Sequence, residues 1–241
     1  MNSIETRGLT KHFGARTAVD HLDLTVNDGE IFALLGQNGA GKTTTIRMLC
    51  GLLTPTDGDA LVMGKSILSQ TADVKRVINV SPQETAVAPN LSVRENLELI
   101  AGAYGLSGDE KKQRVKELLD EFDLNSIAAK RAKKLSGGWQ RRLSIAMALV
   151  SEPKVLFLDE PTLGLDVIAR SELWDVIRSL KGRATVILTT HYLEEARELS
   201  DRIGVMKDGR LLFVGTADEI LKETGESDFE KAFVKLVKEG K

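Results

Sequence analysis

A glycine-rich stretch that ends in a lysine and threonines carries the clearest chemical meaning in the sequence. Gly36, Gly41, Lys42 and Thr43 have the spacing G-x-x-x-x-G-K-[ST]. Glycines at these positions let consecutive backbone N–H groups approach phosphate oxygens, and a helix that begins there adds its own free N–H groups. The lysine can reach the β- and γ-phosphates of a nucleotide, and the threonine hydroxyl can bind Mg²⁺. The predicted phosphate-binding residues are Gly36, Asn38, Gly39, Ala40, Gly41, Lys42, Thr43 and Thr44.

The elements that flank this motif are of the types such a site requires. The apolar run 31–35 predicts a buried strand, and residues 44–49 predict the start of a helix. An ordinary glycine-rich turn is the alternative. Ordinary residue frequencies give the bare pattern in roughly one chain of this length in a hundred. The motif in its context therefore favours nucleotide binding.

Three further predicted strands are each followed by polar side chains that could act on phosphate: 155–158 by Asp159 and Glu160, 184–188 by His191, and 77–80 by Gln83. An apolar run that ends in an aspartate is the usual form of a Walker B site, where the carboxylate holds Mg²⁺. Taken singly, Glu160 could be a structural acid, His191 a core histidine and Gln83 an ordinary loop residue.

Composition narrows the class of protein. A chain of 241 residues can bury one sizeable core, which favours one domain with an embellishment. The net charge of −2 provides no global basic field, so we expect no nucleic-acid partner. Cys50 is the only cysteine, which leaves no intrachain disulfide and fits a reducing compartment. We expect neither a signal peptide nor a membrane-spanning helix, because no run approaches the ~18 apolar residues that a span needs.

Alternating apolar residues predict two strands, over 3–9 and 20–26, in an antiparallel layer on the nucleotide-binding core. Phe13 lies between these strands. It could be a core aromatic residue, or it could stack on the face of an adenine ring.

The middle and the end of the chain have helical spacing. Helices are expected over 93–104, 109–122 and 136–149, at 173–180, and in the tail from 218. Asp109 is the expected N-cap of the second helix. Residues 203–206 and 211–214 predict a hairpin.

These elements predict an α/β fold: a P-loop (RecA-like) nucleotide-binding core with an N-terminal antiparallel β layer and an inserted α-helical subdomain. Residues 1–241 are expected to form a single domain. Its expected parts are the core in 1–84 and 151–215, the helical subdomain in about 85–150, and a C-terminal helical tail in 216–241.

Residues 135–143, LSGGWQRRL, resemble the LSGGQ signature of ABC-type ATPases. The other motifs of that family follow in family order: Phe13 as the adenine-stacking aromatic, Gln83 as the Q-loop, Asp159 and Glu160 as Walker B, 163–166 as the D-loop, and His191 as the switch histidine. The resemblance covers about residues 3–215. Trp139 departs from it, because glutamine is commoner there.

The resemblance implies a role for each matched residue. Glu160 would be the general base, with His191 and Gln83 as further catalytic residues. Thr43, Gln83 and Asp159 would hold Mg²⁺. Nucleotide contacts would come from Phe13, the P-loop, Ser136, Gly137, Gly138 and Asp166.

The resemblance also implies partners. ATP would bind between two nucleotide-binding subunits arranged head to tail, because the family places the signature of one chain on the nucleotide of the other. An integral membrane permease would be the second partner, which implies a cytoplasmic protein held on the inner face of the membrane. Residues 84–104, with Tyr104 and the face formed by Val93, Leu97 and Ile100, are expected to transmit movement to it.

Two readings of function stay open beside this one. Residues 90–106 resemble the exporter subclass of transporter ATPases, but a soluble ABC-type ATPase acting on the ribosome or DNA is an alternative, and so is a regulator that binds ATP without turnover.

A basic run could form a nucleic-acid patch, but a solvated face is favoured because no aromatic residues are interleaved with it. Its members are Lys130, Arg131, Lys133, Lys134, Arg141 and Arg142.

Overall fold

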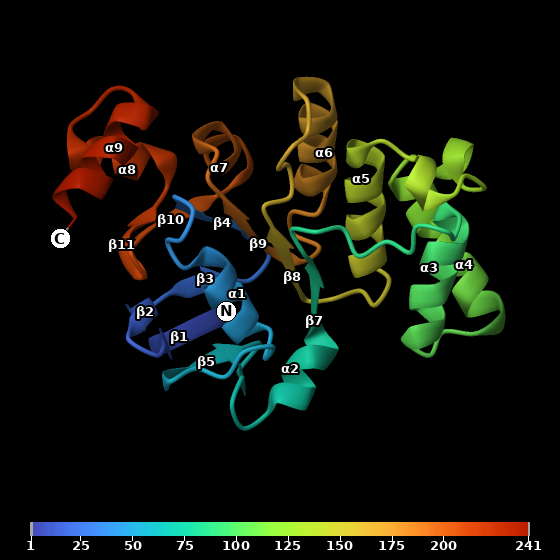
Figure 1. Ribbon diagram of the computed structural model, residues 1–241, viewed down its shortest axis with the longest axis horizontal. Coiled ribbons are helices and arrows are strands. Elements are labelled where there is room, and N and C mark those ends of the chain that lie inside the picture. The colour runs from blue at the N-terminus through green and yellow to red at the C-terminus, as the bar shows by residue number, and fades with distance from the viewer. Residues whose placement is uncertain (1, 241) are drawn as a thin grey trace.

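The computed structural model describes residues 2–240, and its centre is a six-stranded sheet (Figure 1). The strand order is β11 (Arg210–Gly215), β10 (Arg202–Lys207), β4 (Ile31–Gly36), β9 (Thr185–Thr190), β8 (Val155–Asp159) and β7 (Ile78–Ser81). All neighbours are parallel except the β10–β11 hairpin, which was predicted from the sequence. The carboxyl ends of β4, β7, β8 and β9 therefore meet along one edge, where ligands bind in open α/β sheets.

Two apolar layers cover the faces of this sheet. Every residue of β4, β8 and β9 is buried, as expected for parallel strands with both faces covered. Phe32 and Leu34 face α1 (Lys42–Leu49) and an antiparallel sheet. Ala33 and Leu35 face the other side, where α5 (Gly137–Ala148), α6 (Val167–Ser179) and α7 (Leu193–Leu199) pack.

The predicted antiparallel layer is a second sheet with more strands than the sequence indicated. It consists of β1 (Asn2–Phe13), β2 (Arg16–Leu22), β3 (Thr25–Asn27), β5 (Asp57–Val62) and β6 (Lys65–Ser66). The single strand expected over 20–26 is wrong: β2 ends and β3 begins within it. The break lies at residues 23–24, and His21, with φ +46°, lies inside β2 where its register against β1 shifts. Phe13 lies at the end of β1 rather than between two strands.

Helices occupy the chain between β7 and β8, as predicted. They are α3 (Val93–Ala103), α4 (Gly108–Glu121) and α5, with short 3₁₀ turns at Asn125–Ile127 and Ala132–Lys134. A capping box of Ser92 and Glu95 starts α3. The N-cap of α4 is Ser107, not Asp109, which lies in the first turn. Figure 1 shows α3 and α4 set apart from the sheet, with α5 between them and α6.

The remaining helices complete the fold. α6 begins earlier than expected because the side chain of Asp166 accepts a hydrogen bond from the N–H of Ala169 (2.9 Å) and caps it. α2 (Thr71–Val77) and α7 lack long apolar spacing and were not predicted. The tail forms α8 (Ala217–Thr224) and α9 (Phe229–Glu239), which lie beyond β11 (Figure 1). Within residues 2–240, no helix combines the length and the apolar character needed to cross a membrane.

Candidate active site

The glycine-rich loop joins β4 to α1 in a conformation that needs glycine. Gly41, the N-cap of α1, has φ +106°, and a Cβ there would lie 2.5 Å from the carbonyl oxygen of Ala18. A Cβ on Gly36 would lie 2.5 Å from the carbonyl oxygen of Met206. The loop is thus held tightly between β2 and β10, and it leaves the first N–H groups of α1 open to an anion.

The ammonium group of Lys42 lies inside the loop. Its Nζ donates to the carbonyl oxygen of Gly36 (2.7 Å) and lies 3.1 Å from Oε1 of Glu160. The Lys42 side chain is only 5% exposed, so it is held in place at the cradle rather than free in solvent. A fixed cation beside open N–H groups suits the β- and γ-phosphates of a nucleotide.

Hydroxyl and carboxylate oxygens meet at the carboxyl end of β8. Oδ1 of Asp159 accepts hydrogen bonds from the hydroxyls of Thr43 (3.1 Å) and Thr189 (2.6 Å). Residues 2–240 contain no group of three or more His, Cys, Asp or Glu side chains that could hold a metal. One carboxylate and one hydroxyl still fit Mg²⁺, which keeps several waters and takes further ligands from substrate phosphates.

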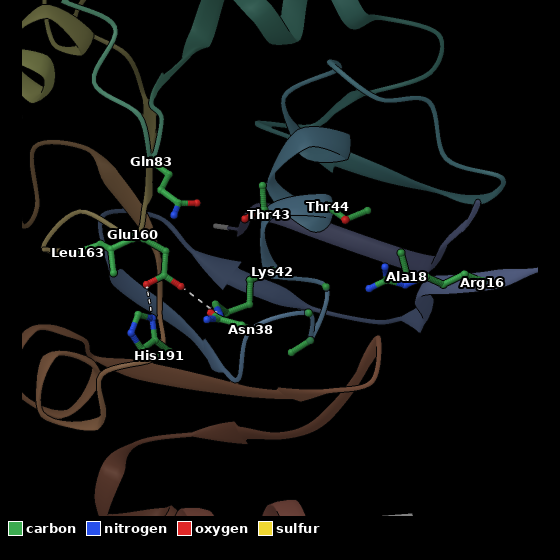
Figure 2. Close-up of a pocket in the computed structure, with 13 residues that line it drawn as sticks. Arg16, Ala18, Asn38, Lys42, Thr43, Thr44, Gln83, Glu160, Leu163 and His191 are labelled. Atoms are coloured by element: carbon green, nitrogen blue, oxygen red, sulfur yellow. Dashed lines mark hydrogen bonds and ion pairs between the residues drawn. The ribbon is translucent and has the colours of Figure 1, made fainter. Parts of the chain in front are cut away.

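Glu160 is oriented from both sides (Figure 2). Oε2 of Glu160 lies 2.7 Å from Nδ1 of His191, while Oε1 faces Lys42. Its backbone has φ +49°, which is uncommon for a residue other than glycine, and its N–H is bound by the hydroxyl of Thr189 (3.0 Å). A buried carboxylate held in this way is suited to receive a proton from a water at the cavity.

The cavity between these groups has a volume of about 310 Å³. Gln83 lines it from the β7 side with its side chain directed inward, and Leu163 also contributes (Figure 2). The structure therefore brings Lys42, Thr43, Glu160 and His191 together with Gln83. Arg16 and Ala18 of β2 also line the cavity, and nothing in their sequence context distinguished them.

Phe13 is not a core residue, because 50% of its surface is exposed. It pairs across the β1–β2 turn with Arg16, which lines the cavity. Nζ of Lys11 lies 5.3 Å from the centre of its ring. An exposed ring beside the cavity is compatible with stacking on a base, and that role stays a prediction.

The signature residues form a separate surface. Ser136 is the N-cap of α5, but its side chain makes no capping hydrogen bond. Gly138 packs so closely on α6 that a Cβ would lie 3.0 Å from that of Ala169. A small hollow of about 40 Å³ lies here, lined by Ser136, Gly138 and Trp139 among others. Ser136, Gly137, Gly138 and Asp166 do not line the nucleotide cavity of their own chain.

The expectation of a solvated basic face is wrong for two of its residues. Lys130, Arg131, Lys133 and Lys134 are exposed, but Arg141 and Arg142 are only 5% and 7% exposed. Arg142 lies over the Trp139 ring, 4.8 Å from its centre, and pairs with Glu172 (3.2 Å). Both arginines face inward because they lie on the side of α5 that packs on the fold.

A buried acid near the site was missed by the sequence reading. Glu195 of α7 is fully buried, and its Oε1 accepts from the hydroxyl of Thr162 (2.8 Å) and from Nε1 of Trp174 (3.3 Å). Its Oε2 has no hydrogen-bond partner among residues 2–240. Burial raises the pKa of Glu195, and the charge of Glu160 acts in the same direction. A single glutamate on a short helix gives no signal in the sequence.

Known proteins share this fold and are similar to this chain in sequence. A solved ATP-binding subunit of an ABC transporter superposes with a TM-score of 0.85 and 31% identity, covering 97% of this chain and 98% of that one. A dimeric ATP-binding cassette bound to ADP and phosphate superposes with a TM-score of 0.78 and 27% identity, covering 88% of this chain and 98% of that one.

Sequence relatives agree with the structural ones. The daunorubicin resistance ATP-binding protein DrrA3 of Streptomyces coeruleorubidus is 45% identical over 92% of this chain and 71% of its own length. The probable multidrug ABC transporter ATP-binding protein YbhF of Escherichia coli K12 is 40% identical over 97% of this chain, which spans 41% of that relative's length. The profile of the family described as ABC transporter matches residues 19–163. The chain therefore belongs to the ABC transporter family.

Proposed function

We propose that this chain binds and hydrolyses ATP and thereby drives export through a separate membrane-spanning subunit. The observation that carries the proposal is the convergence of Lys42, the Thr43–Asp159 pair and the Glu160–His191 pair on one cavity. These groups supply phosphate binding, metal binding and a positioned base, which together are the parts needed to transfer a phosphoryl group to water.

Each group has a distinct task in this mechanism. The loop N–H groups and Lys42 hold the β- and γ-phosphates. Thr43, Asp159 and Gln83 would hold Mg²⁺, which neutralises charge on the phosphate oxygens when bound. Glu160 takes the proton of the attacking water. His191 fixes the Glu160 carboxylate through the 2.7 Å contact of its Nδ1. It would also contact the γ-phosphate of bound ATP.

The signature surface is suited to contact a second nucleotide-binding subunit. Ser136 lies at an open helix start, outside the cavity of its own chain. Val167 and Ile168, which follow Asp166 at the start of α6, are 70% and 72% exposed. Apolar residues at this exposure beside an unused anion-binding helix start support a head-to-tail dimer, in which each signature contacts the nucleotide of the other chain.

A groove beside the helices is suited to the membrane subunit. It has a volume of about 520 Å³ and is lined by α2, α4 and the end of α3, including Tyr104 and Leu106. Tyr104 and Leu99 are 49% and 54% exposed. Val93 and Leu97 are fully buried and can only support this wall from behind. Tyr104 is an exposed aromatic anchor in this groove, which supports docking there and with it a place on the inner face of the membrane.

The exporter assignment rests on the relatives, whose names refer to multidrug and daunorubicin resistance and to Nod factor export. Action on DNA or the ribosome has less support, because only four members of the basic run in 130–142 are exposed and the net charge of the chain is −2. A regulator without turnover is disfavoured because Lys42, Glu160 and His191 line one cavity, and Asp159 contacts Thr43, which also lines it.

Crosslinking to the membrane protein encoded beside this chain tests the transporter assignment. Cys50 is buried, and burial raises the pKa of its thiol, so it should react little with a crosslinker. A Cys50→Ala background removes it altogether. Single cysteines at Ala86 and Ala88, both at least partly exposed, should crosslink to the membrane subunit. A cysteine at exposed Lys222 on α8 is the control and should not. Crosslinks at neither alanine, with ATPase activity still stimulated by that subunit, would move the docking site elsewhere.

A further inference from the structure

Arg141 joins the helix of the signature motif to the loop that carries Gln83. Its Nη1 donates to the carbonyl oxygen of Pro82 (2.6 Å), and its Nη2 donates to that of Gln83. The two carbonyls are consecutive, so the planar guanidinium binds both at once. Arg141 is only 5% exposed, which makes this a contact inside the protein and not a surface bridge.

A second contact lies one helical turn along α5. The hydroxyls of Ser144 and Ser81 lie 2.9 Å apart in a buried position. Because residues three apart share a helix face, Arg141 and Ser144 form one polar strip on α5. The strip is hydrogen-bonded to three consecutive residues, Ser81, Pro82 and Gln83.

The contact has a clear energetic reason. Ser81 is the last residue of β7 that pairs with β8, so the carbonyls of Pro82 and Gln83 lie beyond the strand ladder. The guanidinium of Arg141 donates to both of them, and because this side chain is buried, its own donors would be costly to leave unsatisfied. Burial lowers the pKa of the Arg141 guanidinium, but the charges of Asp159 and Glu195 oppose this effect.

We propose that Arg141 is a positioning residue that fixes the backbone of Pro82 and Gln83 to α5, so that the Gln83 side chain and the Ser136 end of that helix keep one geometry. Because the carbonyl of Gln83 and the N–H of Glu84 belong to one planar peptide group, the free part of the loop then begins after Glu84. A shift of Gln83 toward nucleotide would move Ser136 with it, which links the chain's own cavity to the signature surface that it presents to a partner. The inference rests on the proposed function for the role of Gln83, but the contact itself does not.

A kinetic test separates positioning from folding. Arg141→Met keeps most of the length of the side chain and removes all its hydrogen-bond donors. Arg141→Lys retains the charge but replaces the forked guanidinium by a single ammonium group. The matched control is Arg114→Met, because Arg114 also binds two consecutive carbonyls, of Leu149 (2.5 Å) and Val150 (3.2 Å), away from the cavity. Turnover is measured without the membrane subunit, because Arg114 also lines the proposed docking groove. Both methionine variants should have a lower melting temperature than the wild type. Only Arg141→Met should lower kcat, by up to about a hundredfold, the size of effect that a misplaced group can have. The KM for ATP should change less, and Arg141→Lys should recover part of kcat.

A double variant asks whether Arg141 acts through Gln83. The kcat of Arg141→Met combined with Gln83→Ala should be no lower than that of Gln83→Ala alone. Losses that multiply, or an equal loss of kcat in Arg114→Met, would overturn the proposal. Full turnover in Gln83→Ala would instead remove Gln83 from the proposed catalytic mechanism, and the following measurement would then decide the role of Arg141 alone.

Spin labels measure the contact directly and without turnover. Cysteines at exposed Glu84 and Lys134, in the Cys50→Ala background, carry one nitroxide each. Pulsed electron paramagnetic resonance should give a narrow distance distribution that is the same with and without ATP. Arg141→Met should broaden it and Arg114→Met should not. A distribution unchanged by Arg141→Met would overturn the proposal.

Discussion

At the scale of single residues, the site depends on buried charges whose partners are already in place. Lys42 and His191 contact opposite oxygens of Glu160, and the hydroxyl of Thr189 binds both Asp159 and the N–H of Glu160. Such pre-arranged groups require little reorganisation when a phosphate arrives. Glu195 is the exception, because one of its oxygens has no partner among the described residues.

Glu195 should make stability depend on pH. Its pKa is raised in the folded state by burial, so the unfolded chain ionises first as pH rises above the ordinary glutamate value of about 4.3. Between that pH and the pKa of Glu195 in the folded protein, the free energy of unfolding of the wild type should therefore fall relative to that of Glu195→Gln. Above the folded-state pKa, the two curves of unfolding free energy against pH should run parallel. Urea unfolding at a series of pH values measures this, with Glu223→Gln on exposed α8 as the control. Parallel curves over the whole range would show that Glu195 is not perturbed.

At the scale of elements, sequence patterns predicted what periodicity can encode. The strands β4, β8 and β9 and the helices α3 to α5 follow from apolar spacing and from motif context. The break between β2 and β3 and the short helices α2 and α7 did not follow, because they are too short for a periodic apolar pattern and depend on tertiary packing. The inward turn of Arg141 was missed for a related reason: its partners are backbone carbonyls, which no side-chain pattern shows.

The open start of α5 leads to a prediction for the signature motif. Ser136→Arg places a bulky cation at this helix start and leaves the P-loop of its own chain untouched. ATP affinity of the monomer should be nearly unchanged, while ATP-dependent dimerisation and hydrolysis are lost. Ser107→Arg is a matched control, because Ser107 is also an exposed N-cap without a capping bond. Fluorescent-nucleotide titration and light scattering measure the two properties. Loss of affinity together with turnover, with dimerisation intact, would place the site within one chain.

At the scale of the whole molecule, two surfaces lie on different parts of one chain. The nucleotide cavity lies at the carboxyl ends of the central strands, and the signature surface lies at the start of α5 against α6. Sequence motifs predicted most of the residues that line the cavity, together with Ser136 and Gly138 of the signature surface, but not Arg16 and Ala18. Their separation could not be predicted, because it depends on how α5 and α6 pack on the sheet.

The catalytic role of Glu160 is the central claim, and turnover by Glu160→Gln tests it most directly. The amide keeps the shape of the side chain but cannot accept the proton of the attacking water. Steady-state ATP hydrolysis should fall by about 10²–10⁴-fold while ATP still binds. Size-exclusion chromatography with limiting Mg²⁺ should then show an ATP-stabilised dimer. Glu198→Gln, half exposed on α7, should behave as wild type. Wild-type turnover by Glu160→Gln would contradict the mechanism.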